Sequence, residues 1–359
     1  MDVKKNKNNK TKISSLQGLR LYAFLGIFLS HIGIIEWGPW GVSIFLVLSG
    51  FLMTYNYIAM DLPAGIVNCV HFAVNKLAKL YPLHIIMMVS AIVMQTAKGM
   101  IFYSPQRGII DGGIIGLHLF LAQSWIPRSG VYFSLNGVSW FLGVSLFCYF
   151  IFPFILDRIR TYKSSNEAIK YMIIIYLIQI VVAYAVTYIY VPMYISKDFT
   201  KWVTYVCPAF RLGDFTIGCN LGYLFVNRKN SDDDEVSRIA CTVIEIIIFG
   251  VSLLIPYNWL VNNGMEWIAT DIIYIPFSLT LVWLFATEHG YFSRLSSKGL
   301  FILGGGLTPY AFLIHFQVVM DWLMFTSVNK WLSILVCLII TFTLSALWKR
   351  YDQYSSALL

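Results

Sequence analysis

The stretch that decides the fold runs from Leu16 to Ile35, LQGLRLYAFLGIFLSHIGII. It is apolar and long enough to cross the hydrocarbon core of a bilayer as a helix. Two of its residues are costly to place there, Arg20 near one end and His31 in the other half. Ionisable groups inside a membrane usually line a polar cavity or pair with one another, so both are candidate functional residues.

The spacing of these two residues places them on one helix face. Arg20 and His31 are eleven residues apart, which is three helical turns plus about 20°. Their side chains should therefore point the same way, roughly 16 Å apart along the axis. This face is predicted to carry a cation near one membrane surface and a titratable base about half a membrane away.

The composition is typical of a polytopic membrane protein. Of 359 residues, 58% are hydrophobic and 12% are charged, whereas about a quarter of a soluble domain is charged. Repeated apolar runs of about twenty residues predict an all-α transmembrane helical bundle. The net charge of +8 fits basic cytoplasmic loops, and no nucleic-acid partner is expected. The six cysteines form no CxxC pair, so neither a metal site nor a disulfide framework is expected.

The apolar runs predict about ten spans with both termini cytoplasmic. In this topology nineteen Lys and Arg residues lie inside and six outside, with Arg211 within a span, as the positive-inside rule requires. Ile109 to Trp125 is short and interrupted by polar and glycine residues, so we expect it to be re-entrant or to lie at the outer surface. If it crossed fully, every later loop would be inverted. The predicted spans are 16–35, 41–60, 76–97, 137–156, 171–191, 203–226, 239–256, 268–287, 300–325 and 331–348.

Three regions follow from this pattern. Residues 1–15 are expected to be a disordered basic cytoplasmic tail, 16–350 the transmembrane domain, and 351–359 a cytoplasmic C-terminal tail. Residues 61–75 read as a short intracellular segment between spans. The small residues of Gly41–Leu52, GVSIFLVLSGFL, are expected to pack closely against the first span.

Several motifs follow one another along the chain: LQGLR (16–20), GVSIFLVLSGFL (41–52), NKLAKLYP (75–82), NGVSWFL (136–142), RLGDFTIG (211–218) and YAFLIH (310–315). In this order, and together with Arg20 and His31, they resemble the acyltransferase-3 family of integral-membrane acyltransferases, which modify hydroxyls of surface glycans. The sequence departs from the family pattern at Lys76 and Lys79, which replace two arginines, and at Ser145, where many relatives have glutamate.

The resemblance implies a donor and a site. The donor would be cytoplasmic acyl-CoA, by expectation acetyl-CoA, with no cofactor bound permanently. Its anionic end would bind Arg20, Lys76 and Lys79, and His31 would be the general base for a hydroxyl of a surface glycan or glycolipid. The protein would be a multi-pass protein of the cytoplasmic membrane. The negative charge that develops on the thioester oxygen could accept hydrogen bonds from Trp140, Asn136 and Ser49.

Other assignments stay open. Glu36 could orient the His31 imidazole or could be a solvated loop carboxylate, and His315 is a lesser catalytic candidate. Arg211 matches a family position but could equally pair with Asp214. Arg20 could be an interfacial anchor, and the two lysines could be ordinary positive-inside residues.

Two other functions compete with the glycan acyltransferase. A transporter or glycan exporter would need pseudo-symmetric halves, and no internal repeat is detectable in the sequence. A membrane acyltransferase that acts on lipid or protein is a narrower alternative. The oligomeric state has no signal in the sequence.

Overall fold

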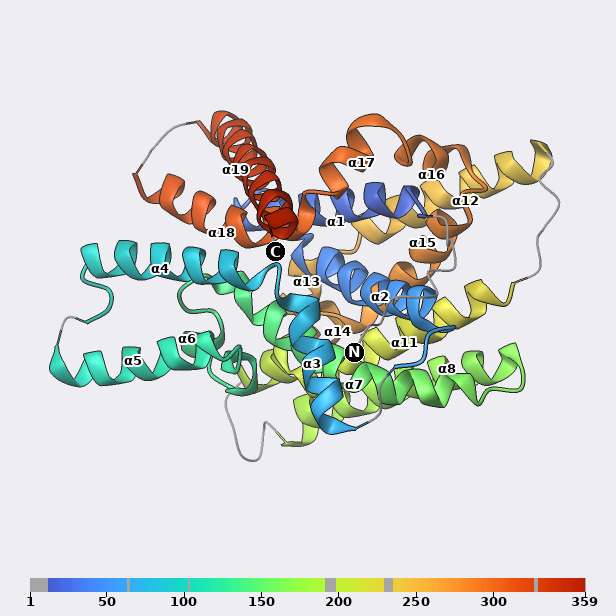
Figure 1. The fold of residues 1–359 in the computed structure, drawn as a ribbon, viewed down its shortest axis with the longest axis horizontal. Coiled ribbons are helices and arrows are strands. Elements are labelled where there is room, and N and C mark those ends of the chain that lie inside the picture. Colours follow the sequence, from blue (N-terminus) through green and yellow to red (C-terminus); the bar gives the residue numbers. More distant parts are fainter. Residues whose placement is uncertain are drawn as a thin grey trace.

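The computed structural model describes residues 12–62, 65–102, 104–190, 198–228, 235–325 and 329–358. All the regular secondary structure in these ranges is helical, which confirms the all-α prediction (Figure 1). The first eleven residues of the expected N-terminal tail lie outside the described residues.

Twelve helices of ten or more residues form the body of the described chain: α1 (Ser15–His31), α2 (Gly38–Tyr57), α3 (Ile66–Leu77), α4 (Tyr81–Ala97), α5 (Pro105–Leu119), α7 (Trp140–Arg160), α8 (Ser165–Ala185), α11 (Pro208–Val226), α12 (Glu235–Leu253), α15 (Ile275–Thr287), α18 (Thr308–Phe325) and α19 (Lys330–Leu358).

Shorter helical segments connect them: α6 (Ser129–Tyr132), α10 (Asp198–Lys201), α13 (Tyr257–Asn262), α14 (Glu266–Ala269), α16 (Tyr291–Ser296), α17 (Gly299–Gly305), the 3₁₀ turns η1 (Gln123–Trp125), η2 (Gly137–Ser139) and η5 (Ile272–Tyr274), and the π-helical turns η3 (Val186–Tyr190) and η4 (Trp202–Val206).

Helix α2 is the centre of the fold, packed between α1 and α11. A Cβ on Gly41 would lie 2.4 Å from the carbonyl oxygen of Ala23 in α1, so the expected close contact with the first span is present there. Gly50 differs, because a Cβ on it would lie 2.0 Å from the carbonyl oxygen of Phe215 in α11. The small residues of α2 therefore serve two neighbours, since glycine on opposite faces lets a backbone approach from each side.

Five described helices are long and apolar enough to cross a membrane: Gly38–Tyr57, Gly137–Arg160, Ser165–Tyr190, Glu235–Leu253 and Lys330–Tyr354. Two further pairs of helices pass the same test together but are bent, α3 with α4 by 63° and α17 with α18 by 69°. Pro82 and Pro309 lie in the first turns of α4 and α18, where a missing N–H costs nothing. Helices α1 and α15 contain 17 and 13 residues.

The segment before Pro82 is more ordered than the sequence indicates. Residues 66–77, within and just after the expected intracellular link, form α3, which packs against α7. Its Cys69, Ala73 and Leu77 are buried, and this four-residue spacing is that of a helix face packed on a neighbour. The prediction missed this helix because most of its other residues are exposed apolar or polar side chains.

Helix α5 contains most of the ambiguous segment 109–125 and runs antiparallel to α4 (Figure 1). The Tyr81 hydroxyl, at the start of α4, donates to the carbonyl oxygen of Leu119 at the end of α5. With 15 residues, α5 is shorter than the roughly 20 residues of a full span. Its placement as a re-entrant segment or at the outer surface stays a prediction.

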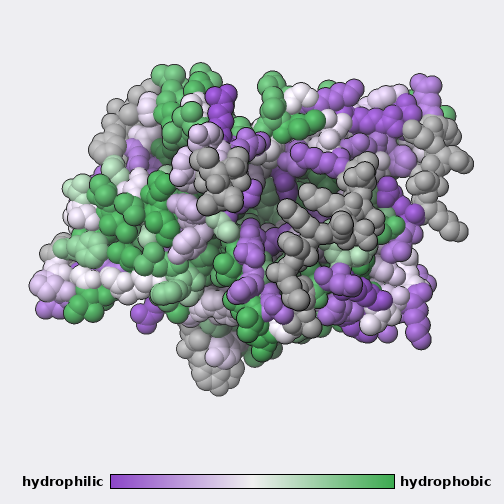
Figure 2. Space-filling model, in the orientation of Figure 1, coloured by the Kyte–Doolittle hydropathy of each residue, from purple (hydrophilic) through white to green (hydrophobic). Residues whose placement is uncertain are grey.

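The outer surface is apolar over several helices. Figure 2 shows hydrophobic side chains over α4 and α19, and hydrophilic side chains towards the tips of α8 and α12. The exposed apolar residues include Val89 and Val93 on α4 and Leu335 and Ile339 on α19. Contiguous apolar surface of this kind suits contact with lipid.

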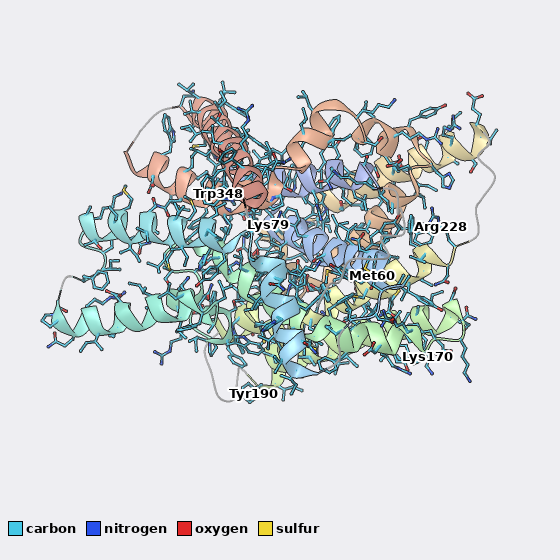
Figure 3. All side chains as sticks on the ribbon, in the orientation of Figure 1. Met60, Lys79, Lys170, Tyr190, Arg228 and Trp348 are labelled. Atoms are coloured by element: carbon cyan, nitrogen blue, oxygen red, sulfur yellow. The ribbon has the colours of Figure 1, made fainter. Side chains whose placement is uncertain are left out.

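The C-terminal helix closes the bundle beside the bend between α3 and α4. Helix α19 packs along α18 and continues to Leu358, through the segment expected as a tail. Figure 3 shows Lys79 next to Trp348 of this helix. The Nζ of Lys79 lies 3.8 Å from a carboxylate oxygen of Asp352, so α19 contributes to the surroundings of this lysine.

Candidate active site

Helix α1 contributes one polar side chain to each of two neighbouring cavities. His31, its last residue, lines a cavity of about 270 Å³, called here the His31 cavity. Arg20 lines a second cavity of about 140 Å³, the Arg20 cavity. The shared helix face expected from their spacing therefore opens into both cavities.

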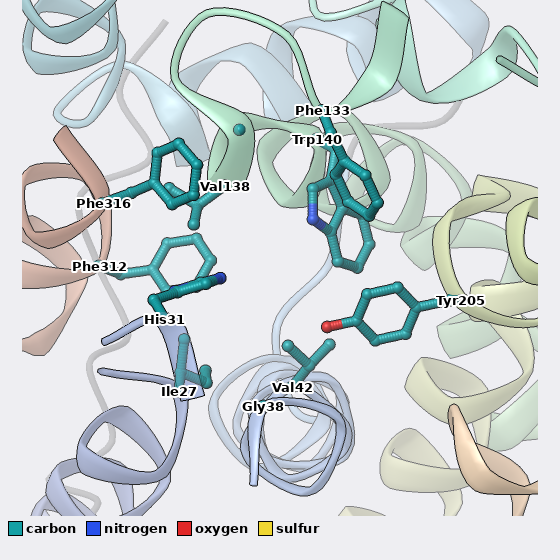
Figure 4. Close-up of a pocket in the computed structure, with 11 residues that line it drawn as sticks. Ile27, His31, Gly38, Val42, Phe133, Val138, Trp140, Tyr205, Phe312 and Phe316 are labelled. Carbon is teal, nitrogen blue, oxygen red and sulfur yellow. The ribbon is translucent and has the colours of Figure 1, made fainter. Parts of the chain in front are cut away.

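The wall of the His31 cavity is mostly apolar. Helices α1, α2 and α18 and the segment 133–140 supply aliphatic and aromatic side chains (Figure 4). In Figure 4 the His31 ring lies at one side, with a ring nitrogen directed into the cavity. A base in surroundings of this kind meets few competing water molecules. The apolar lining residues are Ile27, Val42, Phe133, Val138, Phe312 and Phe316.

His31 is hydrogen-bonded to a second histidine from another helix. Its Nδ1 lies 2.9 Å from Nε2 of His315, which projects from α18 and is fully buried. The ring centroids are 5.1 Å apart and the planes differ by 30°. Phe316 packs edge-on against His31, and Phe24 packs edge-on against His315. These contacts hold both rings in place.

The hydrogen bonds of His315 indicate which nitrogen of His31 carries a proton. His315 Nδ1 lies 3.1 Å from the carbonyl oxygen of Ala311, and because a carbonyl only accepts, Nδ1 donates. Burial favours a neutral His315, whose Nε2 is then an acceptor. The proton between the rings therefore belongs to His31 Nδ1, and Nε2 of His31 keeps a free lone pair.

Two further polar side chains lie across the cavity from His31. Trp140 is the first residue of α7, and Tyr205 lies in η4. In Figure 4 the indole nitrogen of Trp140 and the phenol oxygen of Tyr205 both point into the cavity. Their rings touch each other, with centroids 5.0 Å apart.

Arg20 lies in its cavity as an unpaired cation. Within the described part of the chain, its guanidinium has no hydrogen-bond or ion-pair partner. The other polar residues there are Ser49, Ser145, Tyr149 and Thr308. The Ser49 and Tyr149 hydroxyls lie 3.1 Å apart, and the Thr308 hydroxyl donates to the carbonyl oxygen of Gly305. A largely buried guanidinium without a carboxylate is poised to accept an anionic group.

Three phenylalanine rings contact one another at the wall of the Arg20 cavity, and one of them also lines the His31 cavity. Phe312 lines both cavities, while Phe45 and Phe141 line the Arg20 cavity. The ring centroids of Phe141 and Phe312 are 5.3 Å apart, and those of Phe45 and Phe312 are 6.0 Å apart. A slender ligand that reached from Arg20 to His31 would have to displace Phe312.

The two lysines flank the Arg20 cavity without lining it. Leu77 and Leu80, from the same bend, reach the cavity wall. Lys76 donates to the Tyr57 hydroxyl and lies 4.2 Å from the centre of that ring. Lys79 is 67% exposed at its side chain, so it is accessible to a ligand in solution.

The remaining predicted residues occupy other places. Glu36 accepts a hydrogen bond from the Ser30 hydroxyl at 3.1 Å, while the His31 nitrogen that it could have oriented is bonded to His315. Asn136 is fully buried and donates from Nδ2 to the carbonyl oxygen of Leu313, two residues before His315. It therefore supports α18 beside the histidine pair.

Arg211 belongs to a buried ion cluster outside both cavities. Its guanidinium is 3.0 Å from Asp214, which confirms the alternative pairing, and it also contacts Asp271. All three side chains are fully buried, and Gln179 donates to Asp214 at 2.7 Å. The cluster links α8, α11 and the start of η5, which is a structural role.

Sequence reasoning missed Tyr205 and Asp271. Asp271 is a carboxylate inside the predicted span 268–287, and that span position was a usable signal for a partner of Arg211. Tyr205 has no such signal, because aromatic residues are common at the ends of membrane spans. Among the described residues, no group of three or more His, Cys, Asp or Glu side chains could hold a metal ion.

Two known proteins are similar to parts of this chain. Acyltransferase MdmB of Streptomyces mycarofaciens is 30% identical over 162 residues, which are 40% of this chain and 38% of that protein. O-acetyltransferase OatA of Staphylococcus aureus is 23% identical over 309 residues, 81% of this chain and 48% of that protein. The chain thus spans about half the length of these relatives or less. No solved structure matches it.

A family model described as an acyltransferase domain, Acyl_transf_3, matches residues 13–349. This match contains both cavities, the histidine pair and the ion cluster. The chain therefore belongs to the acyltransferase-3 family of integral-membrane acyltransferases.

Proposed function

We propose that this protein transfers an acetyl group from cytoplasmic acetyl-CoA to a hydroxyl of a surface or exported glycan, with His31 as the general base. The observation that carries the proposal is the free ring nitrogen of His31 in an apolar cavity, on the same helix as the unpaired Arg20. Family membership and the name of the relative OatA support acyl transfer to oxygen.

A single donor molecule would extend through both cavities, from Arg20 to His31. Arg20 would bind an anionic part of the donor, and the exposed Lys79 with the neighbouring Lys76 would attract its phosphates at the cavity mouth. The pantetheine arm is slender and largely uncharged, so it suits an apolar path that opens when the Phe312 ring, which lines both cavities, is displaced. This arrangement brings the thioester next to His31.

The chemical step needs a base and an acid at one position. A sugar hydroxyl is a poor nucleophile at neutral pH, and removal of its proton in the transition state accelerates attack. Nε2 of His31 takes that proton as the oxygen–carbon bond forms. When the carbon–sulfur bond breaks, the same nitrogen returns the proton to the leaving sulfur, so the products are an ester and a free thiol.

The proposal includes the predicted topology of ten spans with both termini in the cytoplasm, in which this site would extend across the membrane. Arg20, Lys76 and Lys79 would then face the cytoplasm, where acyl-CoA is available, and His31 would lie nearer the outer surface. The excess of inside cations supports this orientation, in a protein of the cytoplasmic membrane. A reporter fused after residue 359 and cysteine labelling near Glu36 would test the two ends of the path.

A direct test compares the surface glycan of cells with the wild-type protein and with His31→Ala. Loss of O-acetyl groups with normal protein levels in the membrane is the expected result. His71→Ala is the matched control, since His71 is exposed on α3 and should leave acetylation unchanged. Full acetylation by His31→Ala would overturn the assignment of the base.

An assay on the purified protein separates the competing functions. Purified protein in nanodiscs, given labelled acetyl-CoA, should label glycan. Movement of glycan across vesicles without labelling would instead identify a transporter. Label in the lipid or protein fraction would identify a different acceptor for the same chemistry.

A further inference from the structure

Two hydrogen-bond donors face His31 across an otherwise apolar cavity. The indole N–H of Trp140 and the hydroxyl of Tyr205 point into the same space as the His31 ring nitrogen (Figure 4). The other side chains that form the wall are aliphatic or phenyl groups. The cavity therefore offers one base on one side and two donors on the other.

Neither donor has a hydrogen-bond partner within the described residues. Trp140 is only 3% exposed, and buried indole and phenol groups usually find an acceptor. The buried Trp40 follows that rule, because its indole donates to the Ser252 hydroxyl at 2.9 Å. The indole N–H of Trp140 and the hydroxyl of Tyr205 therefore indicate that a bound ligand supplies their hydrogen-bond acceptor.

The backbone that carries Tyr205 has an unusual turn. Residues 202–206 form the π-helical turn η4, closed by the Cys207 N–H, which donates to the carbonyl oxygen of Trp202 at 2.8 Å. Turns of this type re-aim a side chain and occur often at functional sites. The adjacent Thr204 hydroxyl lies 2.9 Å from the Thr270 hydroxyl, so the chain is anchored on both sides of Tyr205.

Trp140 is held equally firmly. Its carbonyl oxygen accepts from the Ser124 hydroxyl at 2.8 Å, and the preceding Ser139 hydroxyl lies 3.2 Å from a ring nitrogen of His118. Both donors thus project from backbone segments that are anchored by hydrogen bonds. Donors that are fixed before the reaction stabilise a developing charge without a cost for reorganisation.

We propose that the Tyr205 hydroxyl and the Trp140 indole N–H bind the thioester carbonyl oxygen and stabilise the negative charge it acquires. This inference rests on the proposed acyl transfer. When the acceptor oxygen bonds to the carbonyl carbon, the π electron pair moves to the carbonyl oxygen between these donors. The pair returns as the carbon–sulfur bond breaks, and both donors keep their protons throughout.

The positions of His31 and of the two donors fit these separate roles. The attacking hydroxyl must approach from the side of His31, which removes its proton. The carbonyl oxygen must then point away from the base, towards the opposite wall, where Trp140 and Tyr205 lie. Asn136 and Ser49, the other expected donors, do not line this cavity.

Tyr205→Phe removes one oxygen atom and tests the inference on the full-length protein in nanodiscs. The kcat for acetyl transfer should fall about 100-fold, while the KM values for acetyl-CoA and acceptor change less than about twofold. Tyr176→Phe is the matched control, because its hydroxyl donates to the carbonyl oxygen of Ile272, outside both cavities. A wild-type kcat in Tyr205→Phe would overturn the assignment, as would a loss confined to the acceptor KM.

A binding measurement keeps the test independent of turnover. A trifluoromethyl ketone analogue of acetyl-CoA hydrates to a tetrahedral carbon and mimics the intermediate. It should bind Tyr205→Phe and Trp140→Phe at least about tenfold more weakly than wild type, while CoA itself binds all three proteins equally. Equal affinity for the analogue would overturn the inference. If wild type transfers no acetyl group, the proposed function fails first, and the two failures are distinguishable.

Discussion

His31 Nδ1 and His315 Nε2 lie 2.9 Å apart and join the end of α1 to α18 across the wall of the cavity. A catalytic histidine is more often oriented by a carboxylate, which also stabilises the imidazolium. Here the partner is a second imidazole, that of His315, whose Nδ1 donates a hydrogen bond to the Ala311 carbonyl oxygen. In surroundings as apolar as these, a neutral partner avoids the burial of an additional charge.

This pair predicts different outcomes for two substitutions of His315. His315→Leu removes the acceptor for His31 Nδ1 and should lower kcat by about 10- to 100-fold. His315→Gln keeps an acceptor oxygen near the position of Nε2 and should recover part of that loss. The KM for acetyl-CoA should stay the same in both variants, as measured by steady-state kinetics in nanodiscs. Equal activities of the two variants would show that the hydrogen bond does not position His31.

The unpaired guanidinium of Arg20 predicts a conflict between stability and donor binding. Arg20→Met fills a similar volume without a buried charge, so its melting temperature in detergent should be a few degrees above that of wild type. Added CoA should stabilise the wild-type protein by mass action and leave Arg20→Met unchanged.

The control for this prediction is Lys79→Met, at an exposed position. Its melting temperature without ligand should equal that of wild type, and its response to CoA should be reduced without being lost. A lower melting temperature for Arg20→Met would mean that the guanidinium has a structural partner.

The sequence was sufficient to predict the all-α fold class and the shared helix face of Arg20 and His31. Arg20 and His31 could be predicted to share a face because helical geometry alone relates positions on one helix. The pairing of His31 with His315 could not be predicted, since it depends on how α1 and α18 pack across 284 positions of sequence. Nor could the sequence show the bends between α3 and α4 and between α17 and α18, and the number of candidate spans depends on whether each bent pair is one span.

Tyr205 illustrates a second limit. Its direction depends on the π-helical turn η4, and such a turn leaves no clear pattern in hydrophobic periodicity. Helix α3 shows a third limit, because a link of mixed polarity became a helix only through its packing against α7. Tertiary contacts, which local patterns do not contain, decided each of these features.

The shared wall of the two cavities predicts a change in donor range. Phe312→Ala removes the ring that lines both and should join them into one space. The ratio of kcat/KM for butyryl-CoA to that for acetyl-CoA should rise by about tenfold, since the removed carbons correspond to the extra methylenes. The measurement is a competition assay with both donors.

Phe225→Ala is the control for general loosening, because Phe225 is 3% exposed and packs on Phe51 without lining either cavity. It should leave the donor ratio unchanged. The same ratio in Phe312→Ala and wild type would place the acyl group elsewhere.

The buried cluster predicts unequal effects from its three members. Arg211 faces two carboxylates, Asp214 and Asp271, so Asp271→Asn leaves the guanidinium paired with Asp214 and should cost little. Arg211→Leu leaves both carboxylates without a cation in a fully buried place, and should cost about 3–5 kcal/mol. The double variant Asp214→Asn/Asp271→Asn leaves the guanidinium without a carboxylate and should be as destabilising as Arg211→Leu.

Thermal unfolding in detergent, with the amount of folded protein in the membrane, measures this order of stabilities. If Asp271→Asn were as destabilising as Arg211→Leu, Asp214 would not be sufficient to balance the charge, and both carboxylates would be required to hold α11 against η5.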